Sequence, residues 1–318
     1  MASRAPDAAR LTTLVQVARH GSLTRAAQAL GLTTSAVSQQ MSALEAECGV
    51  ALIERQSRGV TLTGDGLVLL EHAEQLVRHL DETRATMAQL SGELAGRVRV
   101  GSIASGAAAL VLPASRVLRT SAPAVTMGVS TMEPSASIDA VVDGSVDVAL
   151  IDVYDHVPIA LPSQLLVEDV LTEPLVLVVP RDSNVPARAT LSRLKDERWV
   201  IPPAQAACGA ATRHACRSAG FEPDVAWETD DLLLLVAAAS RGEGIALLPR
   251  LAVADSVARV ELRRLVDPVL TRRLQLVSRR TTAQRPIVRA CLDAIQHVAR
   301  SAATTGRGPS PRPASDRA

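Results

Sequence analysis

Residues 11–63 read LTTLVQVARHGSLTRAAQALGLTTSAVSQQMSALEAECGVALIERQSRGVTLT and contain two short helical segments joined by a glycine turn. Ser22 is a suitable N-cap for the first segment, in which Ala26 and Ala27 belong to an apolar inner face. Gly31 follows this segment, where a tight turn requires a positive φ angle. The spacing predicts a helix-turn-helix, although helical cores that bind no nucleic acid also show it.

The second segment, residues 35–47, has a polar face suited to the DNA major groove. Its apolar positions, Val37, Met41 and Leu44, follow helical spacing. The outward positions carry short polar side chains, at Thr34, Ser35, Ser38, Gln39 and Ser42. Glutamine can bind adenine through two hydrogen bonds, and serine or threonine can bond bases or phosphates. We therefore expect a recognition helix whose five polar residues contact DNA.

The next stretch, ALIERQSRGVTLT at residues 51–63, predicts a short hairpin with Arg55 and Arg58 near its tip. Such a wing suits contact with phosphates or with the minor groove. Residues 1–62 carry six arginines against four acidic residues, so the local positive charge is small. Because phosphate contacts supply much of the affinity for DNA, one copy should bind weakly, and a dimer on two half-sites would compensate. Residues 8–63 thus form the expected DNA-binding domain.

Residues 64–96 contain the expected linker and dimerisation helix. Apolar residues recur in alternating steps of four and three, which is the heptad pattern of a coiled coil. They are Leu69, Ala73, Leu76, Leu80, Thr83, Met87, Leu90 and Leu94. The remaining faces are polar, which favours a coiled coil over a helix packed only inside its own domain. We expect five of these side chains to contact a second copy of the chain: Leu69, Leu76, Leu80, Met87 and Leu90.

These first 94 residues resemble the DNA-binding domain and linker helix of the LysR-type transcriptional regulators. The matching residues are Ala26-Ala27, Leu30, Ser35-Ala36-Val37-Ser38, Leu44-Glu45, Gly49-Val50, Leu52, Glu54-Arg55, Arg58, Leu62-Thr63 and Gly66. Ile53 and Gln39 stand where many family members carry phenylalanine and arginine, so the base that Gln39 contacts stays open. The resemblance implies a sequence-specific regulator that binds double-stranded DNA as a homodimer or homotetramer.

Residues 97–300 alternate between apolar strands and helices, a pattern typical of parallel sheets covered by helices. The stretches GRVRVGSIAS, MEPSASIDAVVDGSVDVAL and VAAASRGEGIALLP resemble the effector-binding domain of the same family, which is similar to periplasmic binding proteins. We therefore expect two α/β lobes around a cleft. Lobe 1 should comprise residues 97–168 and 270–300, and lobe 2 residues 169–269, with crossings near Val167–Leu171 and Asp267–Thr271. The tail, residues 301–318, is rich in Pro, Ser and Arg and is expected to be disordered.

The effector site can be placed only at the ends of strands. Ligands of α/β sheets lie beyond the carboxyl ends of strands, often against helix N-termini, which favour anions. The polar residues at such positions are Ser102, Ser105, Glu133, Ser135 and Thr229. The resemblance points to the same segments, and Ser105 matches a position that often contacts the effector. Ser105 and Ser135 could instead serve only as helix caps.

Composition argues against several other classes of protein. With 34 basic and 33 acidic residues, the net charge of +1 does not suit a protein that coats polyanions. The segment MASRAPDAAR lacks the apolar core of a secretion signal, and no apolar run reaches the ~20 residues of a membrane span. We therefore expect a cytoplasmic protein with no membrane partner. The four cysteines are too scattered for a disulfide scaffold.

The sequence contains no complete pattern for catalysis or metal binding. Cys208, His214 and Cys216 lack a closing fourth ligand, so no metal is expected. Cys208 and Cys216 could form a redox pair, although buried cysteines are usually inert. Because a serine elbow, a phosphate loop and a dinucleotide fingerprint are all missing, we expect no cofactor and no enzyme activity. The alternative to an effector-controlled regulator is a cytosolic small-molecule-binding protein or enzyme whose N-terminal helices only dimerise it.

Overall fold

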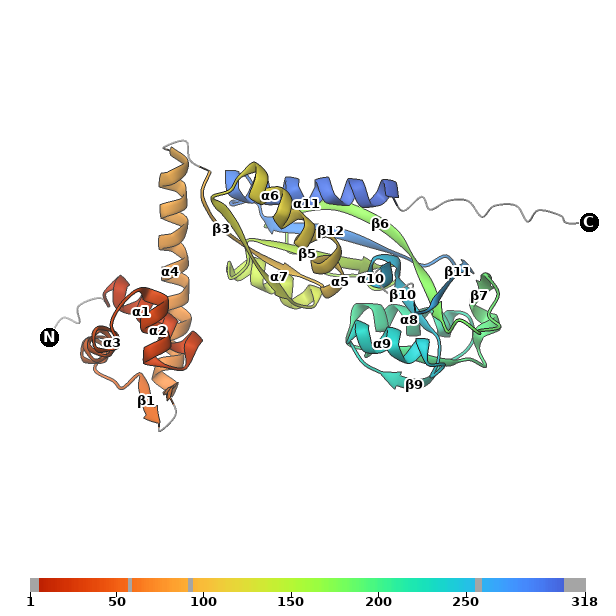
Figure 1. Ribbon diagram of the computed structural model, residues 1–318, viewed down its shortest axis with the longest axis horizontal. Helices are drawn as coiled ribbons and strands as arrows, with labels where there is room; N and C mark the ends of the chain where they lie inside the picture. The colour runs from red at the N-terminus through yellow and green to blue at the C-terminus, as the bar shows by residue number, and fades with distance from the viewer. Residues whose placement is uncertain (1–5, 57–58, 91–93, 255–258, 306–318) are drawn as a thin grey trace, which may run out of the picture. The chain divides into compact units, whose positions relative to one another are not determined.

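The computed structural model describes residues 6–56, 59–90, 94–254 and 259–305. The chain divides into two compact units, Met1–Glu93 and Leu94–Ala318 (Figure 1). Among the described residues, no helix combines the length and the apolar character needed to cross a membrane.

The first unit is a winged helix-turn-helix followed by a long helix. Its elements are α1 (Ala8–His20), α2 (Leu23–Leu30), α3 (Thr34–Cys48), β1 (Ile53–Gln56), β2 (Gly59–Leu62) and α4 (Gly64–Leu90). Side-chain caps begin the first three helices: Ser22 accepts a hydrogen bond from the Arg25 amide, and Thr33 accepts one from the Ala36 amide. Gly31 ends α2 at φ 66°, the left-handed conformation that its sequence position predicts.

The core of this unit includes the inner faces of the three short helices. It contains Leu14, Val37, Met41 and Leu44, each 0% exposed, and Ala73 of α4 joins it. The hairpin of β1 and β2 pairs Ile53 with Leu62 in an antiparallel register. The hairpin, α3 and α4 thus pack against one shared core.

Lobe 1 of the second unit is a five-stranded sheet in the order β4-β3-β5-β12-β6. The strands are β3 (Gly96–Ser102), β4 (Val125–Thr131), β5 (Val148–Tyr154), β6 (Leu165–Val179) and β12 (Thr271–Arg279). Helices α6 (Leu112–Ser121) and α11 (Pro286–Thr305) lie side by side on one face, and α7 (Pro134–Asp143) lies on the other (Figure 1). The short helix α5 (Ala104–Gly106) and a π-helical turn (Ala107–Val111) lead into α6.

Lobe 2 is built around the second half of β6. Its strands are β7 (Arg188–Thr190), β8 (Arg198–Ile201), β9 (Asp224–Glu228), β10 (Ala246–Pro249) and β11 (Glu261–Asp267). Its helices are a 3₁₀ turn (Leu191–Leu194), α8 (Ala207–Ser218), α9 (Leu232–Ser240) and α10 (Arg250–Val253). Strands β10 and β11 pair with β6, and β8 pairs with β9 in a separate two-stranded sheet.

The 15-residue strand β6 belongs to both lobes, which changes two sequence-based expectations. Its first part, Leu165–Pro174, pairs with β12, and its last part, Leu175–Val179, pairs with β10 and β11. The pairing partner therefore changes after Pro174, whereas we expected lobe 1 to end at residue 168. Because β6 and β12 run antiparallel to their neighbours in lobe 1, the sheet is mixed rather than fully parallel. The return crossing lies between Asp267 and Thr271, the range expected for it.

The first part of the tail that we expected to be disordered, residues 301–305, is helical instead, since helix α11 continues to Thr305. The rest of the tail lies outside the described residues.

Candidate functional site

The outer face of α3 presents the polar side chains that the sequence suggests for DNA contact. Thr34, Ser35, Gln39 and Ser42 are exposed, and Ser38 is half-buried. Helical spacing places them opposite the buried apolar residues of α3, because the polar and apolar sets lie on different faces of the helix. The surface can donate and accept hydrogen bonds without a large fixed charge.

The wing is held against α3 by polar contacts. Nη2 of Arg55 donates a hydrogen bond of 2.8 Å to Oγ of Ser38, so this arginine lies beside the outer face of the helix. Oε1 of Glu45 accepts hydrogen bonds from the amides of Leu52 and Ile53, at 2.9 and 3.2 Å. These contacts set the position of β1 relative to α3. Arg58, the other arginine expected in the wing, lies outside the described residues.

The expected coiled-coil seam of α4 is only partly free. Leu69 is partly buried and packs against the core of its own unit, to which Ala73 belongs. The first part of α4 also contacts α1. The contact of Leu69 with a second copy stays a prediction. Further along the helix, Leu76, Leu80 and Met87 remain 53%, 40% and 60% exposed. The side chain of Leu90 lies outside the described residues.

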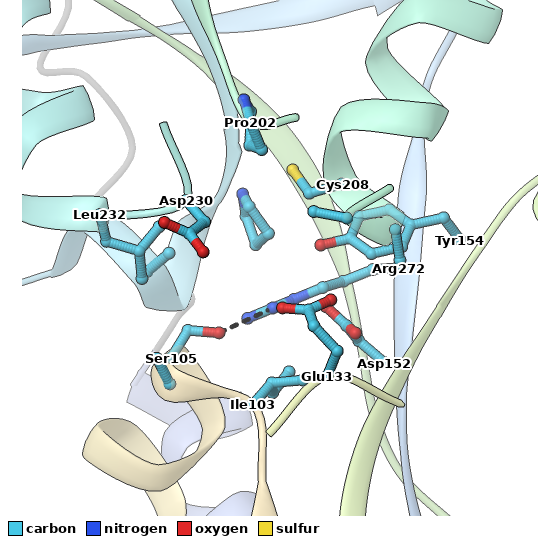
Figure 2. Close-up of a pocket in the computed structure, with 15 residues that line it drawn as sticks. Ile103, Ser105, Glu133, Asp152, Tyr154, Pro202, Cys208, Asp230, Leu232 and Arg272 are labelled. Atoms are coloured by element: carbon cyan, nitrogen blue, oxygen red, sulfur yellow. Dashed lines mark hydrogen bonds and ion pairs between the residues drawn. The ribbon is translucent and has the colours of Figure 1, made fainter. Parts of the chain in front are cut away.

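A cavity lies between the two lobes of the second unit (Figure 2). It encloses about 530 Å³ of empty space, part of which is open to solvent. Lobe 1 contributes Ile103, Ala104, Ser105, Glu133, Asp152, Tyr154 and Arg272. Lobe 2 contributes Pro202, Ala206, Ala207, Cys208, Asp230, Leu232, Pro249 and Ala252.

A buried arginine organises the floor of this cavity. The side chain of Arg272 is 1% exposed, and its Nη1 donates a hydrogen bond of 2.9 Å to Oγ of Ser105. Nη1 also lies 3.2 Å from Oδ2 of Asp152, and Nε lies 2.7 Å from Oε1 of Glu173. Burial alone would lower the pKa of Arg272, but the acidic groups of Tyr154, Glu173 and Asp152 outweigh it and raise the pKa. The guanidinium therefore stays charged and paired.

Two further carboxylates face the cavity from opposite lobes (Figure 2). Glu133 precedes α7 in lobe 1, and Asp230 precedes α9 in lobe 2. Partial burial removes water from the carboxyl group of Glu133 and raises its pKa, and repulsion from Asp152 and Asp230 raises the pKa further. The amide of Ala207, at the start of α8, opposes this shift and lowers the pKa of Glu133. Glu133 of lobe 1 and the first turn of α8 in lobe 2 thus line the same cavity.

Of the five residues that the sequence suggests for the effector, Ser105 and Glu133 line the cavity. Ser102 does not, because it is 0% exposed and its hydroxyl donates to the carbonyl of Ile103 at 3.0 Å. Thr229 also lies outside the lining, where its hydroxyl accepts from the Asp231 amide. Ser135, in the first turn of α7, points elsewhere and is exposed.

Sequence reasoning missed Arg272, although its strand carries a signal. In β12, Arg272 is in phase with the buried residues Leu274 and Leu276. In β6, Glu173 is likewise in phase with Leu175 and Leu177. A charged residue on the buried phase of a strand needs a partner of opposite charge. Arg272 and Glu173, the charged residues on the buried faces of β12 and β6, therefore form an ion pair with each other.

The cysteines are free thiols in the structure. Burial raises the pKa of Cys208 to about 12, and the neighbouring hydroxyl of Tyr154 opposes this shift only in part. Burial also raises the pKa of Cys216 to about 12. Because the thiolate is the reactive form, neither side chain has the low pKa of a redox-active cysteine. Among the described residues, no cluster of His, Cys, Asp or Glu could hold a metal ion.

Comparisons with known proteins agree with both halves of the chain. Residues 9–67 match the family model "Bacterial regulatory helix-turn-helix protein, lysR family", and residues 91–300 match the model "LysR substrate binding domain". The nitrogen assimilation regulatory protein nac of Klebsiella aerogenes is 28% identical over 76% of this chain and 77% of its own length. The transcriptional regulator GltR of Bacillus subtilis is 28% identical over 77% of this chain and 80% of its own length.

A solved structure shares the fold over nearly the whole chain. Full-length CbnR, solved in a complex with its target DNA, aligns with a TM-score of 0.69. The alignment covers 92% of this chain and 99% of CbnR at 20% sequence identity. At this identity the likeness concerns the fold alone.

Proposed function

The chain belongs to the LysR family of bacterial transcriptional regulators, and from this membership we propose residue roles for DNA recognition, dimerisation and effector response. As a member of the family it is a DNA-binding transcriptional regulator with an effector-binding domain. The observation that carries the proposal is the exposed polar face of α3 with Arg55 beside it.

In this proposal α3 lies in the major groove and reads base edges. Gln39 is the residue best suited to specify a base, because its amide can both donate to and accept from adenine. Thr34, Ser35, Ser38 and Ser42 contact bases or phosphates around it. Arg55 supplies a phosphate or minor-groove contact from the wing, and Arg58 is proposed for the same role on sequence grounds.

We assign dimerisation to the exposed apolar residues of α4. Leu76, Leu80 and Met87 lie on the heptad seam and would be buried by a second α4 helix. Leu90 follows them in the same sequence pattern. Two winged modules could then bind two half-sites, which offsets the small positive charge of one module. A homodimer or homotetramer in the cytoplasm, where its DNA lies, is the assembly we propose.

The effector is proposed to bind in the cavity between the lobes. A ligand that contacts both walls binds the closed arrangement better than the open one, and this difference in affinity is what shifts the equilibrium. The strands that join the lobes, β6 and β12, meet at Glu173 and Arg272 beside the cavity. We propose no catalytic role for the cavity, because its thiol and phenol are held in their protonated forms by raised pKa values.

Selection from a random duplex library tests the DNA-binding roles. Purified full-length protein should enrich a short inverted repeat that persists when the salt concentration is raised. The variant Ser38→Ala with Gln39→Ala should change the enriched bases, whereas Gln75→Ala on the exposed surface of α4 should leave them unchanged. Arg55→Ala should weaken binding for all sequences and reduce the slope of log affinity against log salt by about 1. Unchanged base preference in the α3 variant would show that this helix face is not the reader.

A further inference from the structure

We propose that the effector is a small organic cation, with an ammonium or guanidinium group on a short aliphatic body, held between Glu133 and Asp230. This inference rests on the proposed function of the cavity as the effector site. It concerns the chemical class of the ligand, which membership of the family does not specify.

The first argument is the balance of charge in the cavity. Three of the four charged residues that line it are acidic: Glu133, Asp152 and Asp230. The one basic residue is Arg272, whose guanidinium is already engaged by Asp152 and by Glu173 just behind it. The positive charge of Arg272 is therefore neutralised by carboxylates of the protein itself. An incoming anion would meet a surface of net negative charge.

The second argument is that two carboxylates lack a cation. Within the described part of the chain, Glu133 and Asp230 form no ion pair, and they approach the cavity from opposite lobes (Figure 2). Their mutual repulsion contributes to the raised pKa of Glu133. A positive ligand group between them would relieve this repulsion and gain a charged hydrogen bond on each side. It would also draw the two lobes together.

The third argument concerns the N-terminus of α8, which faces the cavity and, as a helix N-terminus, would attract an anion. Glu133 lines the same cavity, and the amide of Ala207 in the first turn of α8 favours its ionised form by lowering its pKa. An anionic effector at this helix end would therefore meet a carboxylate of the chain.

The remaining walls define the body of the ligand. They consist largely of short apolar side chains, including Ala104, Ala206, Ala207, Ala252 and Leu232. Such a surface accommodates a few methylene groups and offers few further polar partners. Tyr154 is the aromatic residue in the lining, and it is 4% exposed, so stacking of a large ring is not favoured.

Titration calorimetry on the full-length protein tests the inference with matched probes. Butane-1,4-diamine, butylamine and (4-aminobutyl)guanidine carry the proposed cation, and butanedioate is the anion of matching length. We expect heat of binding from at least one of the three amines and none from butanedioate at the same concentrations.

Variants locate the binding. Glu133→Gln and Asp230→Asn should each weaken binding of the best amine at least tenfold, because each leaves the cation with one carboxylate fewer. Asp139→Asn is the matched control, since Asp139 is an exposed carboxylate of α7 that does not line the cavity. Its affinity should equal that of the unchanged protein. Thermal unfolding of each variant checks that the fold is retained.

Several outcomes would overturn the inference. Binding of butanedioate in place of the amines, absence of binding by all three amines, or amine affinity that survives both cavity substitutions would each contradict it. Selection from the random duplex library, done on the same protein preparation, tests the proposed DNA-binding function separately from amine binding. A protein that enriches an inverted repeat but ignores the amines is a regulator with an effector of another class.

Discussion

Replacing Arg272 with methionine should severely destabilise the effector-binding unit. The side chain is 1% exposed, and its loss would leave the carboxylates of Asp152 and Glu173 buried without a cation. The hydroxyl of Ser105 would lose its donor as well. Methionine fills a similar volume without charge, so the effect would report the electrostatic part of the contact rather than a cavity.

The magnitude follows from the burial of the pair. Removing one member of a buried ion pair costs about 3–5 kcal/mol, because the partner charge remains in a medium of low polarity. Whole domains are stable by only ~5–15 kcal/mol, so this loss would be a large share of the free energy of unfolding. In urea, with a slope of about 2–3 kcal/mol per molar, the midpoint for this unit should fall by about 1–2 M. Circular dichroism of the full-length protein would follow the transition.

Two further variants make the test specific. Arg273→Met changes the exposed neighbour on the same strand and should alter the free energy of unfolding by no more than about 0.5 kcal/mol. Adding Asp152→Asn and Glu173→Gln to Arg272→Met removes the stranded charges and should restore at least half of the loss. An Arg272→Met protein within about 1 kcal/mol of the unchanged protein would refute the claim that these buried charges depend on each other.

Three other predictions concern the winged module, the long helix and the thiols. Gly66→Ala should destabilise the first unit by about 3 kcal/mol in urea unfolding, because a Cβ there would lie 2.1 Å from the carbonyl oxygen of Leu52. Gly64→Ala is the control, since a Cβ at Gly64 would meet open space. The double variant Leu76→Asp with Leu80→Asp should convert dimers to monomers in sedimentation velocity. The control double variant His72→Asp with Gln75→Asp, which lies off the seam, should stay dimeric. A dimer that survives the Leu76 and Leu80 substitutions would exclude this seam as the dimer interface. Raising the pH from 9 towards 12 should lower the urea midpoint of the effector-binding unit, because burial holds the pKa of Cys208, Cys216 and Cys291 at about 12 while the unfolded thiols ionise near 9.0. In that range the unfolded state binds fewer protons than the folded state, so a midpoint that stays constant between pH 8 and pH 10.5 would contradict these shifts.

The parts of the structure that sequence reasoning predicted are those set by neighbours along the chain. Ser22 caps α2 because its hydroxyl reaches an amide three residues away. Gly31 ends α2 because glycine adopts a positive φ at little cost. The alternation of polar and apolar residues in α3 likewise separates its outer face from its core. Local chemistry of this kind identifies the DNA-binding unit without any long-range information.

Errors arose where one segment serves two environments. Strand β6 runs from Leu165 to Val179 across the lobe boundary expected at residue 168, because pairing with β12 extends it through the polar stretch VEDV. Leu69 follows the heptad pattern as well as Leu76 does, and it is also partly buried against the core of its own unit. Sequence spacing indicates that a residue belongs to an apolar face, but it does not say which surface covers that face.

The sequence by itself determined the family, the winged module and the alternation of strands and helices, because caps, turns and apolar periods act over a few residues. Only the tertiary structure decided the chemistry of the cavity. Arg272 meets Glu173, Asp152 and Ser105 from 99, 120 and 167 residues away along the chain. Glu133, Asp152 and Asp230 line the same cavity as the first turn of α8, which turns a site expected to attract anions into an acidic one. Charges separated so far in sequence act on one another only after folding brings them together and excludes water, since electrostatic interactions depend on distance and on the surrounding medium.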